Sequence, residues 1–189
     1  TTVSSWTWKG HEGKHCLVEV YSDAPEVELF VNGNSVGRQP AGEEHDFRVI
    51  FDTVYMPGVI MATAYYEDNV TENYCLCTAK DEVSLCMVPD KVKIATDDLA
   101  YVAIELRDES GTLQTTADRK VCLKVDGAGY LQGFGSADPL SAENFFDESR
   151  TTYYGRAMAV IRSGDASGTI RLTASADGLE TASVEIEVG

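Results

Sequence analysis

Hydrophobic and polar residues alternate along much of the chain. Val27, Leu29 and Val31 are apolar, and Glu28 stands between two of them. A period of two places alternate side chains on one face of a β-strand. The dipeptide at 32–33, Asn-Gly, follows this run and is a strong signal for a two-residue hairpin turn. The pattern therefore predicts a strand, a tight turn and a second strand.

Similar alternation recurs over most of the sequence, and we find no convincing helical period. Further strands are predicted at residues 16–21, 47–51, 59–66, 73–78, 100–106, 121–125, 157–161, 169–173 and 184–188. Short strands separated by turn residues are typical of β-sandwiches. We therefore predict an all-β fold of two tandem immunoglobulin-like β-sandwich domains. Their expected bounds are 1–80 and 82–189, with Asp81 in the junction.

One long segment breaks the rhythm. Residues 135–154 contain no clear strand, yet they include four aromatic side chains, Phe145, Phe146, Tyr153 and Tyr154. Loops of this length in a compact domain are commonly functional or docked on another surface. The rings either cover a sheet edge or an end of the sandwich, or contact a neighbouring domain or a sugar. We favour the first alternative, because aromatic rings more often contribute buried area.

Charge and composition narrow the classes of partner. The chain has 31 acidic and 15 basic residues, a formal net charge of −16. Nucleic acid and anionic membrane surfaces need clustered Lys and Arg, so neither is an expected partner. No apolar run approaches the ~20 residues of a membrane span. The first residues lack both an initiator Met and a signal-peptide pattern, so we expect the chain to be a fragment.

The five cysteines do not indicate a disulfide framework. Their number is odd and they are scattered, which is typical of a reducing setting and favours the cytoplasm, with export of the parent left open. Cys75 and Cys77 are separated by one residue, not by the two of a redox motif. In a strand they would point to the same face, and we expect simple packing.

The sequence HEGKH at 11–15 fits the zinc-protease signature H-E-x-x-H. That signature requires a helix, which places both imidazoles on one face. Gly13 and the strand pattern that follows do not favour a helix. His45 is the remaining histidine, and no further motif supplies a third ligand. We therefore predict no metal site here.

Acidic pairs are the other candidates for chemistry. Glu12 with Glu19, or the adjacent acids at 97–98, could form a carboxylate dyad, but a general acid needs burial or a partner that raises its pKa. The acids at 97–98 and 108–109 lack the spacing of a calcium loop. Solvated turns are the expected role of all these residues, and no cofactor is expected.

Two elements of the first half together form a family pattern. They read W-x-W-x-G-x-E-G-K and V-E-L-F-x-N-G-x-S-x-G. The matching positions are Trp6, Trp8, Gly10, Glu12, Gly13 and Lys14, then 27–30, Asn32, Gly33, Ser35 and Gly37. This half resembles the module that follows the catalytic barrel in bacterial glycoside hydrolase family 2 enzymes of β-galactosidase type. Residues 98–102, 105–111, 133–139 and 155–162 resemble the family's C-terminal immunoglobulin-like domain.

The resemblance implies an accessory role without catalysis. In the family, two glutamates at strand ends of a (β/α)8 barrel act as acid/base and nucleophile. The sequence pattern predicts no barrel in this chain. None of the family's catalytic residues is therefore assigned to it. The resemblance thus implies a non-catalytic C-terminal region of a β-galactosidase-like parent.

Two function hypotheses follow. In the first, the region braces the catalytic barrel of the same parent chain or makes subunit contacts with a second copy. Trp6 and Trp8, expected on one strand face, would then seal a domain interface. In the second, it is a carbohydrate-binding module with Trp6 and Trp8, or the rings of residues 135–154, stacked on sugars. A weaker third alternative is a sandwich of an unrelated surface adhesin.

Overall fold

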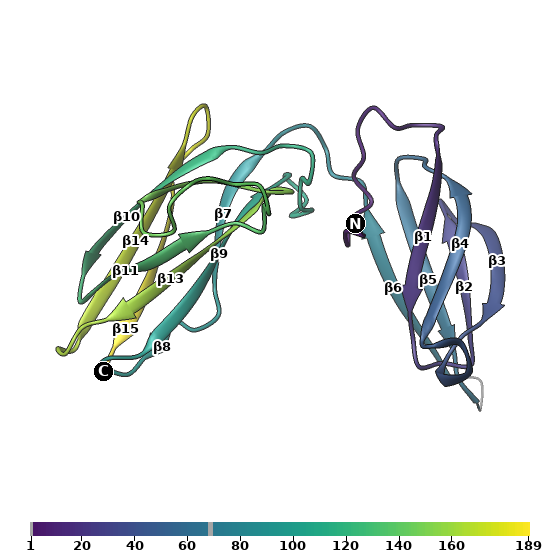
Figure 1. Ribbon diagram of the computed structural model, residues 1–189, viewed down its shortest axis with the longest axis horizontal. Helices are drawn as coiled ribbons and strands as arrows, with labels where there is room; N and C mark the ends of the chain where they lie inside the picture. The colour runs from purple at the N-terminus through teal and green to yellow at the C-terminus, as the bar shows by residue number, and fades with distance from the viewer. Residues whose placement is uncertain (1, 68–69) are drawn as a thin grey trace. The chain divides into compact units, whose positions relative to one another are not determined.

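The computed structural model describes residues 2–67 and 70–189, and it divides into two compact units (Figure 1). Unit 1 is Thr1–Ala79 and unit 2 is Lys80–Gly189. Strands dominate both units; the described part of the chain holds no α-helix, and a short 3₁₀ turn spans Glu43–His45. This architecture confirms the predicted all-β sandwich class. No helix of the described residues is long and apolar enough to cross a membrane.

Unit 1 consists of two antiparallel sheets. The smaller sheet pairs β1 (His15–Tyr21) with β4 (Arg48–Val54). The larger sheet has the order β3-β2-β5-β6, formed by β3 (Asn34–Pro40), β2 (Glu26–Val31), β5 (Val59–Tyr65) and β6 (Thr71–Cys77). Apolar side chains from both sheets make one core: Trp6, Val27, Leu29, Val31, Ala41, Val49, Phe51, Tyr55 and Ile60.

The hairpin between β2 and β3 confirms the prediction from Asn32 and Gly33. Both residues have positive φ, 50° and 78°, as a type I′ turn requires. The Asn32 side chain also fixes the neighbouring strand. Its Oδ1 accepts a hydrogen bond from the Val59 N–H at 2.8 Å, and its Nδ2 donates to the Pro57 carbonyl at 3.0 Å. The turn therefore positions the start of β5 as well as that of β3.

Unit 2 also has two sheets. Its four-stranded sheet has the order β11-β13-β9-β7, formed by β11 (Gly129–Gly135), β13 (Arg156–Ser163), β9 (Leu99–Arg107) and β7 (Ser84–Pro89). Its five-stranded sheet has the order β12-β10-β14-β15-β8, formed by β12 (Ser149–Thr151), β10 (Lys120–Gly127), β14 (Gly168–Ala176), β15 (Ala182–Val188) and β8 (Lys93–Ile94).

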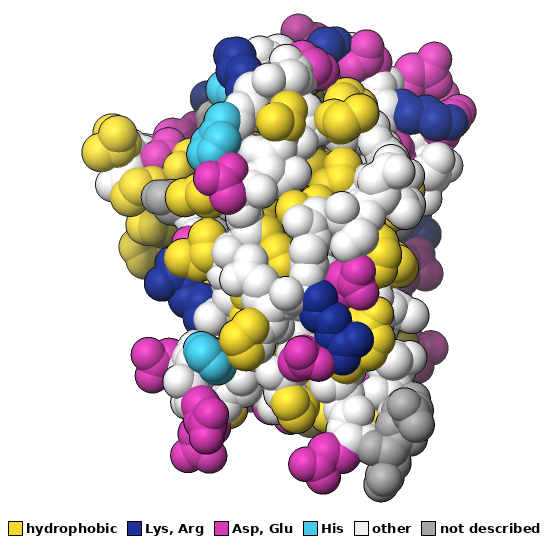
Figure 2. Space-filling view, turned by 90° about the vertical axis from the view of Figure 1, so that its right-hand side faces the viewer, with side chains coloured by type: hydrophobic (Ala, Val, Ile, Leu, Met, Phe, Trp, Pro, Cys, Tyr) yellow, Lys and Arg dark blue, Asp and Glu magenta, His cyan; other side chains and the backbone are white. Residues whose placement is uncertain are grey.

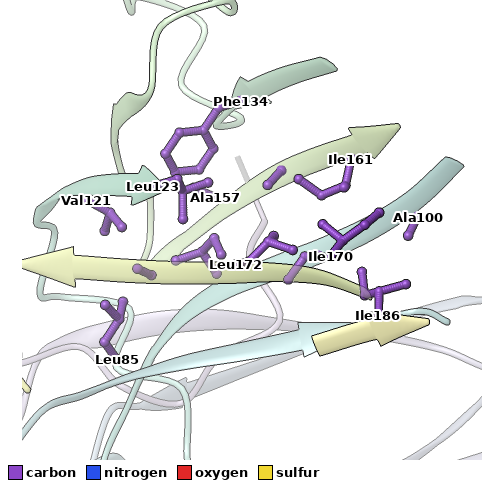
Figure 3. Packing of buried hydrophobic residues seen from close by; sticks show 14 of the residues in the cluster. Leu85, Ala100, Val121, Leu123, Phe134, Ala157, Ile161, Ile170, Leu172 and Ile186 are labelled. Atoms are coloured by element: carbon purple, nitrogen blue, oxygen red, sulfur yellow. The ribbon is translucent and has the colours of Figure 1, made fainter. Parts of the chain in front are cut away.

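The core of unit 2 is formed by alternate residues of both sheets. Ile104 and Ile161 from one sheet and Ile170, Leu172 and Ile186 from the other have no exposed surface. Figure 3 shows several of these side chains gathered with Phe134. Each is one member of an alternating strand, so the period seen in the sequence is the period of burial.

Four strands of unit 2 lie outside the ranges predicted from the sequence: β7, β8, β11 and β12. Within 135–154, expected to lack a strand, β12 pairs with β10 through Lys120 and Thr151. This strand has three residues and its buried member is Arg150, so no apolar alternation marks it. Strand β8 has two residues, and β11 contains three glycines. Such segments owe their strand conformation to their neighbours and not to their own pattern.

Candidate interaction surfaces

The segment HEGKH does not form the helix that a zinc site of this type requires. Residues 9–13 lie in turns, and His15 is the first residue of β1. The His15 imidazole lies beside the Asp52 carboxylate on the neighbouring strand β4. Among the described residues, no group of three or more His, Cys, Asp or Glu side chains could hold a metal ion.

The acidic candidates are paired or hydrogen-bonded in ways that favour the ionised form. Backbone N–H groups of Glu12 itself and of Gly10 lower the pKa of Glu12. Hydrogen bonds from Arg48 and then from Tyr21 lower the pKa of Glu19. A general acid needs the opposite shift. These environments fit a structural role for both carboxylates.

The acids Asp97 and Asp108 of the 97–98 and 108–109 turns are engaged by hydrogen bonds. Asp97 accepts a hydrogen bond of 2.7 Å from Nη2 of Arg162. Asp108 is buried and accepts backbone N–H donors from Lys80, Ser110 and Thr112 at 2.8 to 2.9 Å. Burial raises the pKa of Asp108, but these three donors outweigh it, and the net shift is downward. Its oxygens are therefore engaged by the turn.

Trp6 and Trp8 do not lie on a strand, contrary to the expectation that they share one strand face. Trp6 is only 4% exposed: its ring packs edge to face on Tyr55, with ring centroids 5.0 Å apart, and its Nε1 donates to the Met56 carbonyl. Trp8 is half-buried, and its Nε1 donates to the Ser5 carbonyl at 3.2 Å. The two indoles therefore have different environments.

Residues around Trp6 join the two ends of unit 1. The Thr78 hydroxyl donates a 2.6 Å hydrogen bond to the Trp6 carbonyl. The Ala79 N–H donates at 2.9 Å to the Thr7 hydroxyl. Because these contacts link positions about seventy residues apart, Trp6 anchors the first segment of the chain to the last strand of the unit.

An apolar groove runs beside Trp8. Its cavity volume is about 840 Å³. Its lining residues come from β1 and from the core-facing positions of β5 and β6. Both β1 and β6 are edge strands of their sheets. Residues that line it include Trp8, Val18, Tyr55, Ala62, Tyr74 and Leu76. Tyr74 is 65% exposed, so an aromatic ring is available at the rim of the groove.

On the side of unit 1 where β3 lies, exposed hydrophobic groups alternate with polar ones (Figure 2).

The long connection before β13 covers the edge of β11. The Phe145 carbonyl accepts the Phe134 N–H at 2.7 Å, and the Phe145 ring lies over Gly135, where a Cβ would approach it to 2.6 Å. Phe145 nevertheless stays 59% exposed and Phe146 is 77% exposed. One ring thus replaces the missing side chain of an edge glycine, and the next points away from the core.

Arg150 organises this connection and could not be found from the sequence. The guanidinium is buried, donates from Nε to the Phe134 carbonyl at 3.0 Å, and donates from Nη1 to the Glu143 carbonyl at 3.0 Å. It also lies 4.7 Å from the centroid of the Phe145 ring. An arginine in a polar stretch ordinarily indicates surface, and no neighbouring pattern marks this one as buried.

Tyr153 and Tyr154 form the turn into β13. Both are half-buried, and their rings pack edge to face with centroids 4.5 Å apart. Positive φ values of 51° at Tyr154 and 71° at Gly155 turn the chain. Of the four rings proposed from the sequence of this segment, Phe145 and Phe146 are the exposed pair.

The outward side of the four-stranded sheet in unit 2 carries several exposed apolar side chains beside the charged Glu105, Arg156 and Arg162. Val88, Tyr101, Tyr130 and Met158 are each 43% to 52% exposed. The register places Met158 and Val88 on either side of Ala103, and Tyr101 beside Val160. We call these side chains, with Val160 and Phe145, the outer apolar face. An exposed antiparallel sheet ordinarily carries polar residues on its solvent side, and these apolar positions depart from that pattern.

Comparison with known proteins matches both halves of the chain. The profile of "Glycoside hydrolase family 2 C-terminal domain 5" matches residues 85–185, and a domain of unknown function, DUF4982, matches residues 13–72. Beta-galactosidase BoGH2A of Bacteroides ovatus is 34% identical over 168 residues, which are 88% of this chain and 20% of that protein.

Solved structures give the same result. A glycosyl hydrolase family 2 member from Bacteroides cellulosilyticus matches with a TM-score of 0.89 and 33% identity, over 99% of this chain and 24% of that one. A beta-glycosidase from Bacteroides vulgatus shares the fold, with a TM-score of 0.87 and 24% identity over 98% of this chain and 24% of that one. The chain thus spans about a quarter or less of these relatives.

These matches define an all-β C-terminal region of a large glycosidase. The chain belongs to glycoside hydrolase family 2 and corresponds to the C-terminal region of a β-galactosidase-like enzyme.

Proposed function

We propose that this region is a non-catalytic brace for the catalytic barrel of its parent enzyme. The observation that carries the proposal is the outer apolar face of unit 2. The chain is strongly acidic, with a formal net charge of −16, yet this sheet face presents Val88, Tyr101 and Met158 to solvent. Burial of one large apolar side chain contributes about 1.5–3 kcal/mol. Several such side chains on one face can therefore stabilise a domain contact.

The exposed rings of the connection extend this face. Phe145 lies at its border because its ring covers Gly135 of β11, which is opposite Met158. The buried Arg150 guanidinium lies against the Phe145 ring and is itself fixed by its hydrogen bond to the Phe134 carbonyl. A ring that is held in place loses little freedom on binding, which favours association. The brace would thus use the sheet and the connection as one surface.

The test compares the full enzyme with the isolated 189-residue chain. Met158→Lys places a charge in the centre of the outer apolar face, where the side chain makes no core contact. We expect the isolated chain to keep its unfolding midpoint, while the full enzyme loses galactosidase activity at a heat-inactivation temperature lower by several degrees. The control is Val92→Lys, at an apolar and more exposed position outside the face. Equal inactivation temperatures for both variants and the wild type would refute the brace.

A second candidate function is carbohydrate binding in the groove of unit 1. The observation that favours it is the pair of aromatic residues, Trp8 and Tyr74, on an apolar groove that also includes Glu19. Aromatic rings stack on pyranose faces while carboxylates accept hydroxyl hydrogen bonds. Titration with galactosides and polysaccharides should then give saturable heat that Tyr74→Ala abolishes. Tyr130→Ala is the control, because it removes an exposed tyrosine of unit 2 that does not line the groove. A flat titration across a broad panel would remove this alternative.

A further inference from the structure

Two free cysteines and a methionine occupy neighbouring positions on the outward face of the larger sheet of unit 1. Cys75 and Cys77 lie on the edge strand β6, two residues apart, and both are exposed. Met61 on β5 is the direct register partner of Cys75. Residues i and i+2 of a strand point to the same side, and cross-strand partners share a face. Three sulfur atoms therefore project from adjacent positions of one surface, which we call the sulfur face.

The spacing suits a single metal ion. Successive same-face residues of a strand are about 6.8 Å apart at Cα, and directly opposed Cβ atoms are about 4.5–5.5 Å apart. Two metal–sulfur bonds of about 2.3 Å bring their sulfurs to within roughly 4.6 Å of each other. The two sulfurs must therefore lie closer together than the Cα atoms that carry them. Exposed Cys side chains can reach this separation by rotating about χ1 toward one another. The edge position of β6 leaves both thiols open to solvent.

The donor set is soft. Thiolate and thioether ligands select Cu(I), whereas carboxylates and carbonyls suit harder cations. The register partners around the sulfur face are Val59 opposite Cys77, Phe30 beside Met61, and Asn73 opposite Thr63. None of these carries a carboxylate, and the Asn73 carbonyl oxygen already accepts the Thr63 hydroxyl at 2.7 Å. The surroundings therefore offer sulfur without an oxygen cage.

The other cysteines lack this arrangement. Cys16 is half-buried on the inner side of β1, where it packs against the core of unit 1. Cys86 lies opposite Glu105, and Cys122 lies opposite Ser149 and Ser175. These two cysteines also belong to different sheets of unit 2.

We propose that Cys75, Cys77 and Met61 form a binding site for Cu(I). The two thiols lose their protons to the buffer as they ligate the metal, and Met61 adds a weaker thioether ligand. Copper stays in the +1 state, so no oxidant or reductant takes part. This site is independent of the proposed brace, because it lies on unit 1 and the outer apolar face lies on unit 2.

The test is an anaerobic titration of the reduced 189-residue chain with Cu(I), in competition with a chromophoric Cu(I) chelator. We expect one tight equivalent per chain and an ultraviolet thiolate-to-copper absorption band. The Cys75→Ser/Cys77→Ser variant should bind at least 100-fold more weakly and lose that band. Met61→Leu should keep the stoichiometry but bind about tenfold more weakly.

The matched control is Cys86→Ser/Cys122→Ser, which removes the same number of thiols from unit 2. It should keep both the tight equivalent and the absorption band. Circular dichroism spectra that match the wild type establish that each variant is folded. The proposal is overturned if the two double variants lose affinity equally, because copper would then bind any exposed thiol. It is also overturned if the wild type does not compete with the chelator.

Discussion

Trp6 stabilises unit 1 by packing and hydrogen bonding at one position. Its indole fills the core against Tyr55 and donates to the Met56 carbonyl, while its own carbonyl accepts the Thr78 hydroxyl. A core residue of this size contributes more than a rim residue of the same type, since its removal leaves a cavity. Its structural role can be separated from any role in binding by comparing stability with association.

Trp6→Ala is expected to lower the free energy of unfolding of unit 1 by about 3–5 kcal/mol. The reason is loss of a nearly fully buried ring and of its hydrogen bond. Urea unfolding followed by far-ultraviolet circular dichroism measures the change. Trp8→Ala, at a half-buried position, serves as the control and should cost about 1–2 kcal/mol. Similar losses for both would contradict the different environments of the two rings.

Asp108 gives unit 2 a defined response to acid. Its pKa in the folded chain lies below the ordinary value of 3.8. A carboxyl group with a depressed folded pKa adds stability that is fully present above the unfolded value and is lost as pH falls through the folded value. We therefore expect the contribution of Asp108 to disappear below about pH 3.8.

Asp108→Asn should lower the stability of unit 2 at pH 7 by about 1–3 kcal/mol, because the amide cannot accept all three backbone N–H donors. The difference between variant and wild type should shrink as pH falls below 3.8. Urea midpoints measured from pH 7 to pH 2 test this. Asp126→Asn, an exposed carboxylate paired with Lys124, is the control and should change little. A difference that grows toward low pH would contradict the assigned direction.

At the scale of elements, the hairpin of β2 and β3 depends on a neighbouring glycine. Gly58 has φ of 131°, and a Cβ there would lie 2.0 Å from Oδ1 of Asn32. The Asn32 side chain would be displaced, and its hydrogen bonds with the Val59 N–H and the Pro57 carbonyl would be lost. The start of β5 would then lose the contacts that fix it.

Gly58→Ala is expected to destabilise unit 1 by about 2–4 kcal/mol, the sum of two lost hydrogen bonds and backbone strain. The control is Gly33→Ala, whose φ is also positive but whose Cβ would meet open space. It should cost about 1 kcal/mol, the strain alone. Thermal or urea unfolding of the two variants measures the difference. Equal costs would show that steric exclusion of Asn32 is not the cause.

Strands with a continuous apolar face could be predicted from the sequence, and strands held by neighbours could not. The run at 27–31 could be predicted from its alternating apolar residues, and the turn at 32–33 from two residues that tolerate positive φ. By contrast, β12 exists because Lys120 and Thr151 pair across two strands. Its buried Arg150 is stabilised by carbonyls distant in sequence. No local pattern records such long-range hydrogen bonds.

The candidate surfaces divide in the same way. Phe145 and Phe146 could be selected because rings in a polar loop are conspicuous. The outer apolar face could not, because Tyr101 and Met158 fall in runs where every position is apolar or small, and the sequence does not tell which side is covered. The burial of Trp6 in unit 1 could not be read from the sequence, because it depends on the position of Tyr55, forty-nine residues away. Resemblance to the family supplied the class of parent enzyme.

At the scale of the whole molecule, the two tryptophans of the sequence both lie in unit 1. Their fluorescence therefore reports that unit, whereas circular dichroism reports strands in both. The two hydrophobic cores share no residue. We therefore propose that the units unfold independently.

Leu172→Ala creates a cavity in the core of unit 2 and should cost that unit about 2–5 kcal/mol. The circular dichroism transition should shift in part, while the tryptophan fluorescence midpoint stays the same. Val49→Ala, in the core of unit 1, is the reciprocal control and should move the fluorescence midpoint. A fluorescence midpoint that follows Leu172→Ala would mean that the units unfold as one.

Among the described residues, strand β6 has one long edge without a strand partner, and its single charged residue is Glu72. Backbone donors and acceptors along such a side can pair with another copy of the same strand, and charge is a common protection against this. A concentrated preparation of the separate region should therefore form fibrillar aggregates that bind thioflavin T, and replacement of Asn73 by Lys should delay them. Storage at low concentration is then a requirement set by the architecture of unit 1.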